Sequence, residues 1–187
     1  MMDAFSYLSV LLSIILGLAI AQVLQGYRAL FLARGRVRLD HSVLIWSGLV
    51  LLIAAQAWWA SFGLNARKNW DFADFAVILI QMGLLYMLSA LVLPDVPPGQ
   101  PVDLTGHFDR HRKAFFGFVI AMLASSVLKE AVLEHKLLSP LNGAFHLAFA
   151  STALAGIILS SRRAQLVLSL LAVAEFSIYV ALLFARL

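Results

Sequence analysis

Cysteine is absent from this chain of 187 residues, and charged residues are scarce. Without cysteine the chain has no disulfide, no thiolate ligand for zinc and no thiol nucleophile. Asp, Glu, Lys and Arg make up only 13% of the residues, whereas about a quarter of a soluble domain is charged. A chain with so few charges cannot cover its surface with polar groups in water. The composition therefore excludes an ordinary soluble domain.

Apolar residues fill the sequence, at 62% of the total and with a mean hydropathy of +0.91. They are gathered in six runs, each close to the roughly 20 residues that cross the hydrocarbon core of a bilayer. Backbone polar groups in lipid must be satisfied within the segment, so each run should be helical. We predict an all-α fold, a single transmembrane domain over residues 1–187. Its six expected helices lie at 4–32, 43–64, 72–93, 113–138, 143–160 and 164–187.

The first apolar run needs to be distinguished from a cleaved secretory signal. Residues 19–21 read Ala-Ile-Ala, as they do before a signal-peptidase site. However, the stretch before the run has no Lys or Arg and carries Asp3, and the run continues through Val23 and Leu24. We therefore expect a retained transmembrane helix.

The longest predicted connection, residues 94–109, holds most of the proline. Proline and glycine interrupt helices, so this segment should be a turn-rich loop. It divides the sequence into three helices before it and three after it. The helix-breaking residues are Pro94, Pro97, Pro98, Gly99 and Pro101.

The net charge is +4 and the isoelectric point is near 9.8. The basic residues stand between apolar runs and form no nucleic-acid motif, so we expect a lipid bilayer and no nucleic acid as partner. Of the fourteen Lys and Arg residues, nine are expected on one side of the membrane: Arg28, Arg34, Arg36, Arg38, Arg110, Arg112, Lys113, Arg162 and Arg163. The other side receives Arg67, Lys68, Lys129, Lys136 and Arg186. Since cytoplasmic loops carry the excess of Lys and Arg, this distribution predicts both termini outside the cytoplasm.

Small side chains recur every four residues along the first expected helix, where residues at i and i+4 share one face. This stripe consists of Ser9, Ser13, Gly17, Ala21 and Gln25. Shorter stripes occur in the fourth and fifth runs, at Gly117, Ala121, Ser125 and at Ala144, Ala148, Thr152, Gly156, Ser160. Such faces allow helices to approach closely in lipid. They are explained by packing within one bundle, or by a pore or a subunit interface. We expect a homo-oligomer.

Glu175 lies midway along the sixth run, close to the expected centre of the bilayer. An ionised carboxylate there is costly unless it is paired, and such residues often belong to ion or proton paths. Lys129 lies at a similar depth and follows the stripe of the fourth run, so it should face protein. We predict a Glu175–Lys129 pair, either in a transport path or as a structural ion pair.

A weaker pattern follows Lys129. Glu130 and Glu134 share one helix face, and His146 begins the next run after a short turn. Two carboxylates and an imidazole are ligands for a divalent cation. The alternative is a solvated cluster of charges at the membrane surface. Apart from this possible divalent cation, we predict no cofactor.

Three functions fit these patterns. The first is an oligomeric ion channel or small transporter, which we favour. The second is a membrane scaffold or accessory subunit that binds a partner through its small-residue stripes. The third is a membrane-embedded, metal-dependent enzyme that uses Glu130, Glu134 and His146. We favour a function without catalysis, because the sequence offers no nucleophile beside an orienting base.

Overall fold

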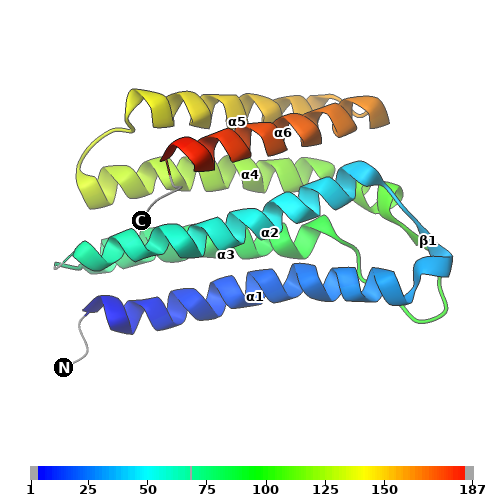
Figure 1. Cartoon of the computed structure of the whole chain (residues 1–187), viewed down its shortest axis with the longest axis horizontal. Helices are drawn as coiled ribbons and strands as arrows, with labels where there is room; N and C mark the ends of the chain where they lie inside the picture. Colours follow the sequence, from blue (N-terminus) through cyan, green and yellow to red (C-terminus); the bar gives the residue numbers. More distant parts are fainter. Residues whose placement is uncertain (1–3, 68, 184–187) are drawn as a thin grey trace.

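The computed structural model describes residues 4–67 and 69–183 and shows six long helices that run side by side (Figure 1). All six are long and apolar enough to cross a membrane, which confirms the predicted all-α membrane bundle. They are α1 (Ala4–Leu32), α2 (His41–Ser61), α3 (Phe72–Val92), α4 (Leu104–Glu134), α5 (Pro140–Ile158) and α6 (Arg162–Leu183). Two short 3₁₀ helices, η1 (Arg34–Arg36) and η2 (Phe62–Ala66), and two short strands, β1 (Val37–Arg38) and β2 (Val102–Asp103), complete the fold.

The bounds of α4 differ from the prediction, since it begins at Leu104 rather than at residue 113. Its first turns are rich in charge, so hydropathy alone stops short of them, yet Phe108 and Arg112 are buried. The helix ends at Glu134, and the next residue, His135, has a left-handed φ of 51°. Residues 184–187, at the end of the sixth predicted helix, lie outside the described residues, as does Lys68.

Five helices form a ring, and the sixth lies outside it. Going round the ring, α2 packs on α3, α3 on α4, α4 on α5, α5 on α6, and α6 again on α2. Helix α1 covers the outer side of α2 and α3 (Figure 1). The most extensive packing joins α3 to α4, across the Pro-rich loop. This loop therefore separates two parts of the sequence but not two bodies of the structure.

The two ends of the bundle differ in charge. The end that carries connections 33–40, 93–103 and 159–161 is called here the basic end, and the opposite end, where α1 begins, the entry end. At the basic end, β1 and β2 pair in parallel, and the Arg36 guanidinium donates to the Gln100 carbonyl at 3.1 Å. The Arg38–Asp103 ion pair there, at 3.7 Å, is exposed and contributes little. The backbone pairing joins two connections that are far apart in the sequence.

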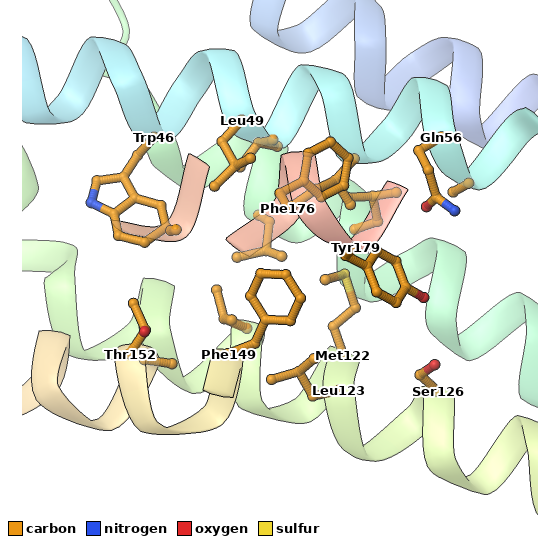
Figure 2. Close-up of a pocket in the computed structure, with 18 of the residues that line it drawn as sticks. Trp46, Leu49, Gln56, Met122, Leu123, Ser126, Phe149, Thr152, Phe176 and Tyr179 are labelled. Carbon is orange, nitrogen blue, oxygen red and sulfur yellow. The ribbon is translucent and has the colours of Figure 1, made fainter. Parts of the chain in front are cut away.

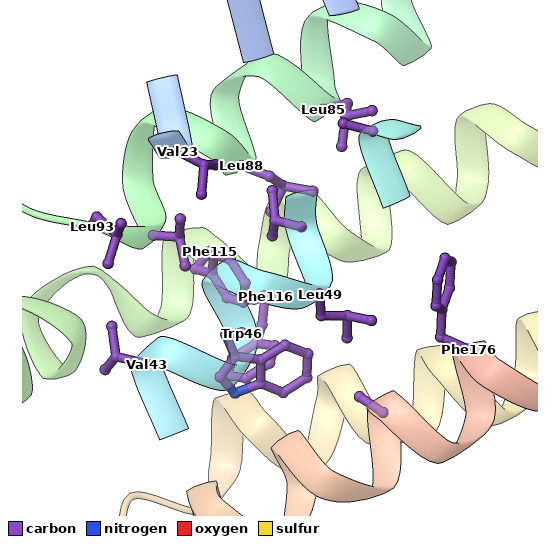
Figure 3. Close-up of a cluster of buried hydrophobic side chains, with 14 of the residues drawn as sticks. Val23, Val43, Trp46, Leu49, Leu85, Leu88, Leu93, Phe115, Phe116 and Phe176 are labelled. Atoms are coloured by element: carbon purple, nitrogen blue, oxygen red, sulfur yellow. The ribbon is translucent and has the colours of Figure 1, made fainter. Parts of the chain in front are cut away.

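An aromatic cluster fills the bundle near the basic end. Trp46 of α2 packs edge-on against Phe115 and Phe116 of α4, with ring centroids 5.7 and 5.2 Å apart. Phe108 adds a fourth ring, 5.7 Å from Phe115. All four side chains are buried, and Figure 3 shows Trp46 against the phenylalanine pair. Edge-to-face rings add stabilisation beyond their burial.

Arg112 closes the end of a neighbouring helix. The last carbonyls of an α-helix have no partner within that helix and attract a positive charge. The buried Arg112 guanidinium donates to three such carbonyls of α5, those of Gly156, Ile157 (2.7 Å) and Leu159 (3.1 Å). The Gln165 side chain of α6 donates to two of the same carbonyls. The basic ends of α4, α5 and α6 are thus joined.

At the entry end, Arg67 donates to the end of a neighbouring helix, as Arg112 does at the basic end. It donates to the carbonyl of Leu133 near the end of α4 and to the buried Asp74 carboxylate, with 2.7 Å between nitrogen and oxygen. Asp74 also completes a capping box with Asp71 at the start of α3. The chain before α3 is thereby fixed to α4.

Candidate functional site: a central cavity

The ring of helices encloses a cavity of about 130 Å³ whose wall comes from all five members, α2 to α6. Most of the wall is apolar, with Leu49, Met122, Phe149 and Phe176 around its middle (Figure 2). Among the residues that the structure describes, no Asp, Glu, Lys or Arg contributes to this wall. The cavity is therefore an uncharged space inside a single chain.

A second cavity of about 230 Å³ lies towards the entry end and is more polar. Lys129, Glu130 and Glu134 of α4 stand in its wall. It shares part of its wall with the central cavity, including four polar side chains: Gln56, Gln81, Ser126 and Tyr179. Gln56, Ser126 and Tyr179 gather at one end of the pocket in Figure 2. The second cavity, called here the mouth, is thus a more polar neighbour of the apolar one on its entry-end side.

The opposite end of the central cavity is closed by aromatic rings. Trp46 and Phe115 belong to its wall, and Phe116 packs behind them. Beyond these rings, Arg112 joins α4 to the end of α5. The cavity therefore has a polar mouth on one side and a tightly packed barrier on the other.

Three side chains of the central wall hold a buried polar atom without a hydrogen bond: Nε1 of Trp46 is a donor, and the other two atoms are acceptors. One is the Oε1 atom of Gln81. The other is Nε2 of His146, whose Nδ1 donates to the Asn142 carbonyl at 2.9 Å. With its proton on Nδ1, a neutral imidazole leaves Nε2 as an acceptor. An unmade hydrogen bond in a buried wall is costly, and a donor supplied by a ligand would remove that cost.

The structure does not bring Glu175 and Lys129 together. The Thr152 hydroxyl donates to Glu175 Oε1 at 3.0 Å, so the carboxyl bridges α5 and α6, and its Oε2 atom is buried without a partner. Lys129 lies in the mouth on α4 and has no ion pair with a described residue. The predicted pair fails to form because α5 stands between α4 and α6 in the ring. Of these two residues, Lys129 lines the second cavity, whereas Glu175 lines neither of the two cavities described here.

The three residues of the weak metal prediction are likewise divided between the two cavities. Glu130 and Glu134 belong to the mouth, whereas His146 belongs to the central wall. Among residues 4–67 and 69–183, no three His, Cys, Asp or Glu side chains are placed to hold a metal ion.

The small-residue stripe of α1 faces away from the ring. Ser13, Gly17 and Gln25 are exposed, while Ser9 and Ala21 are partly buried. A different face of α1, which includes Leu12, Leu16, Ala19 and Val23, packs on the bundle. The stripe of α5 behaves in the opposite way, since Thr152 and Gly156 are buried. Packing within the bundle thus explains the centre of the α5 stripe but not the stripe of α1.

Sequence reasoning did not identify the cavity wall as a site. Gln56 and Gln81 stand out as polar residues in apolar runs, but bonding between helices is their ordinary role. Thr152 and His146 also draw attention in the sequence, but as a packing residue and a metal candidate. Ser126 and Tyr179 give no signal of their own, because such residues are common in membrane helices.

No protein-family model, curated protein or solved structure matches the chain.

Proposed function

We propose that this protein is a small transporter that binds an uncharged solute in the central cavity of its five-helix ring. The observation that supports the proposal most is the combination of a polar mouth at one end with an aromatic barrier at the other. Transporters hold their substrates near the middle of the membrane and expose the site to one side at a time. A cavity closed at one end is the arrangement expected of one such state.

The composition of the wall favours a transporter over an ion channel. A permeating ion must exchange its water shell for charged groups or for rings of carbonyl oxygens. The central wall consists mainly of apolar side chains and has no charged residue. An ion would lose its hydration there without replacement, whereas an uncharged solute would not.

The proposed path differs from the one that the sequence predicts. Lys129 remains part of it, as a residue of the mouth. Glu175 lies beside it, connected to the cavity wall through Thr152. The prediction that both termini lie outside the cytoplasm would make the mouth face outwards, and we retain it as part of the proposal.

The outward stripe of α1 favours a second candidate function, a membrane scaffold or accessory subunit. Gly17 is exposed, and a Cβ atom placed there would meet nothing within 4 Å. Small residues on an open face permit close approach of another helix. A transporter must open its central cavity to water, whereas a scaffold need not. Access of a water-soluble reagent to the cavity therefore distinguishes the two candidate functions.

Thiol labelling tests the transporter, because the natural chain contains no cysteine and every introduced thiol is unique. Val119 lies at the midpoint of α4 and in the central wall. Val119→Cys is reconstituted in vesicles and treated from outside with a maleimide that does not cross membranes. Lys136→Cys and Gln100→Cys report the fractions of molecules that turn the entry end and the basic end outwards. Ala124→Cys, on the exposed face of the same helix, is the control for labelling through lipid.

We expect Val119→Cys to be labelled to a greater extent than Lys136→Cys, because a transporter exposes the site from both ends. Ala124→Cys should remain unlabelled. Labelling of Val119→Cys equal to that of Lys136→Cys would mean a pocket that opens at one end only, which contradicts transport. Absence of labelling at Val119→Cys would contradict the proposal and favour the scaffold.

A further inference from the structure

The size of the central cavity limits what it can hold. Its volume of about 130 Å³ is close to that of an engineered apolar cavity of about 150 Å³ that binds benzene in another protein. Aromatic side chains line much of the wall, including Trp46, Phe115, Phe149 and Phe176. Flat rings pack favourably against such a wall, edge-to-face or offset. The space therefore suits one aromatic ring or an aliphatic group of similar volume.

The polar atoms of the wall define the second requirement. Gln81 of α3 and His146 of α5 each carry a buried acceptor without a hydrogen bond, and Trp46 of α2 carries a buried donor without one. The complementary ligand group is therefore one that both donates and accepts, such as a hydroxyl. Each hydrogen bond formed in such a site contributes about a factor of ten in affinity.

Charge is the third requirement. Within residues 4–67 and 69–183, the central wall has no Asp, Glu, Lys or Arg that would neutralise a carboxylate or an ammonium group. Burying an unpaired charge is far more costly than burying a hydroxyl. Lys129, Glu130 and Glu134 are confined to the mouth, where both signs of charge are present. The inner site should therefore reject ionised molecules.

The geometry points to an uncharged molecule with one aromatic ring and one hydrogen-bond donor, of which phenol is the simplest example, as the ligand of the central cavity. This inference rests on the proposed function, because it names the substrate class of the same site. The ring occupies the space between Trp46 and Phe176, and its hydroxyl lies on the side of the cavity that Gln81 and His146 line.

Fluorine NMR with three probes tests this inference. The protein in lipid nanodiscs is titrated at neutral pH with para-fluorophenol, fluorobenzene and para-fluorobenzoate, and the signal from empty nanodiscs is subtracted. We expect saturable binding of para-fluorophenol, with a Kd about tenfold lower than that of fluorobenzene. No saturable binding of para-fluorobenzoate is expected.

Variants locate the binding. Val119→Phe fills the central cavity and should abolish binding of para-fluorophenol, whereas Val167→Phe, on the exposed face of α6, should leave it unchanged. Combining Gln81→Leu with His146→Phe should remove the tenfold preference for para-fluorophenol while fluorobenzene still binds. This double variant distinguishes loss of the acceptors from loss of the fold.

Three results would overturn the inference: tighter binding of para-fluorobenzoate, equal binding of para-fluorophenol and fluorobenzene, or no saturable binding of any probe. Each can be told apart from failure of the transporter itself. If Val119→Cys is labelled from both ends while the probes behave in one of these ways, transport stands and only the ligand class is wrong. If the probes bind as expected but labelling occurs from one end, the ligand class stands and transport is wrong.

Discussion

Arg112 is a single side chain on which the ends of several helices depend. Replacing it by methionine keeps a long side chain but removes every donor to Gly156, Ile157 and Leu159. Hydrogen bonds from a charged donor contribute about 1.5–3 kcal/mol each, so we expect a loss of about 3 kcal/mol in the free energy of unfolding. Thermal unfolding in a fixed detergent measures it. Arg110→Met, which alters an exposed neighbour, serves as control and should leave the midpoint unchanged.

Gly156 shows how closely two helices approach. A Cβ atom at this position would lie 2.7 Å or less from three ring carbons of Phe116. We expect Gly156→Ala to lower the free energy of unfolding by about 1–3 kcal/mol through overpacking. Gly117→Ala, in open space on α4, should cause no loss. If the contact is the cause, adding Phe116→Leu to Gly156→Ala restores part of the stability, and lack of any recovery would contradict it.

At the scale of single elements, hydropathy predicts most of the helices and misplaces one. Helix α3 begins at Phe72, as predicted, because Asp71 and Asp74 cap a clean apolar run. The start of α4 was missed because its first turns carry His107 to Lys113, whose charges resemble a loop. Part of the explanation is a contact with another helix, because Arg162 of α6 donates to Thr105 in the first turn of α4. No local sequence pattern predicts such a contact.

Asp40 provides a pH-dependent prediction for the start of α2. Burial raises the pKa of this carboxyl, but hydrogen bonds from Ser42 and Thr105 outweigh burial, so its pKa lies below the ordinary 3.8. A lowered pKa means that the carboxylate stabilises the fold fully above pH 3.8 and loses this effect as the pH falls through the folded-state pKa. Arg162 extends the same network by donating to Thr105 at 3.2 Å.

We therefore expect Asp40→Ala to be less stable than the natural chain by about 1 kcal/mol at pH 6, the usual value of a helix cap. The difference should shrink as the pH falls below 3.8. Thermal unfolding at a series of pH values measures it. Asp103→Ala is the control, because Asp103 precedes α4 without a capping hydrogen bond. A difference between Asp40→Ala and the natural chain that is constant across this range would contradict the assignment.

At the scale of the whole molecule, the order of the helices in space was not predictable. Residue spacing shows which side chains share a face, but not which helix that face meets. The sequence places Glu175 and Lys129 at similar expected depths in the bilayer. In the structure they are separated because α5 lies between their helices. The cavity is hidden for the same reason, because its wall takes a few side chains from each of five helices. The apolar runs predict the all-α membrane fold, but they do not predict how the helices are arranged.

The predicted homo-oligomer can be tested on α1. Gly17→Leu places a large side chain on the exposed small-residue stripe and touches nothing within the chain. If a second copy packs on this stripe, the variant should be smaller than the natural protein by analytical ultracentrifugation in detergent. Ala124→Leu, at an exposed small residue of α4 outside the stripes, should not change the mass. A natural protein that is already monomeric would contradict the predicted oligomer.

The hairpin of α5 and α6 is fastened to the rest of the protein at the basic end. Arg112 of α4 donates to carbonyls at the end of α5, and Arg162 of α6 donates to Thr105 of α4. Inside the hairpin, Thr152 bonds Glu175, so α5 and α6 should move as one body. Phe149 of α5 and Phe176 of α6 both stand in the wall of the central cavity. Any motion of the hairpin as one body therefore carries these two parts of the wall together.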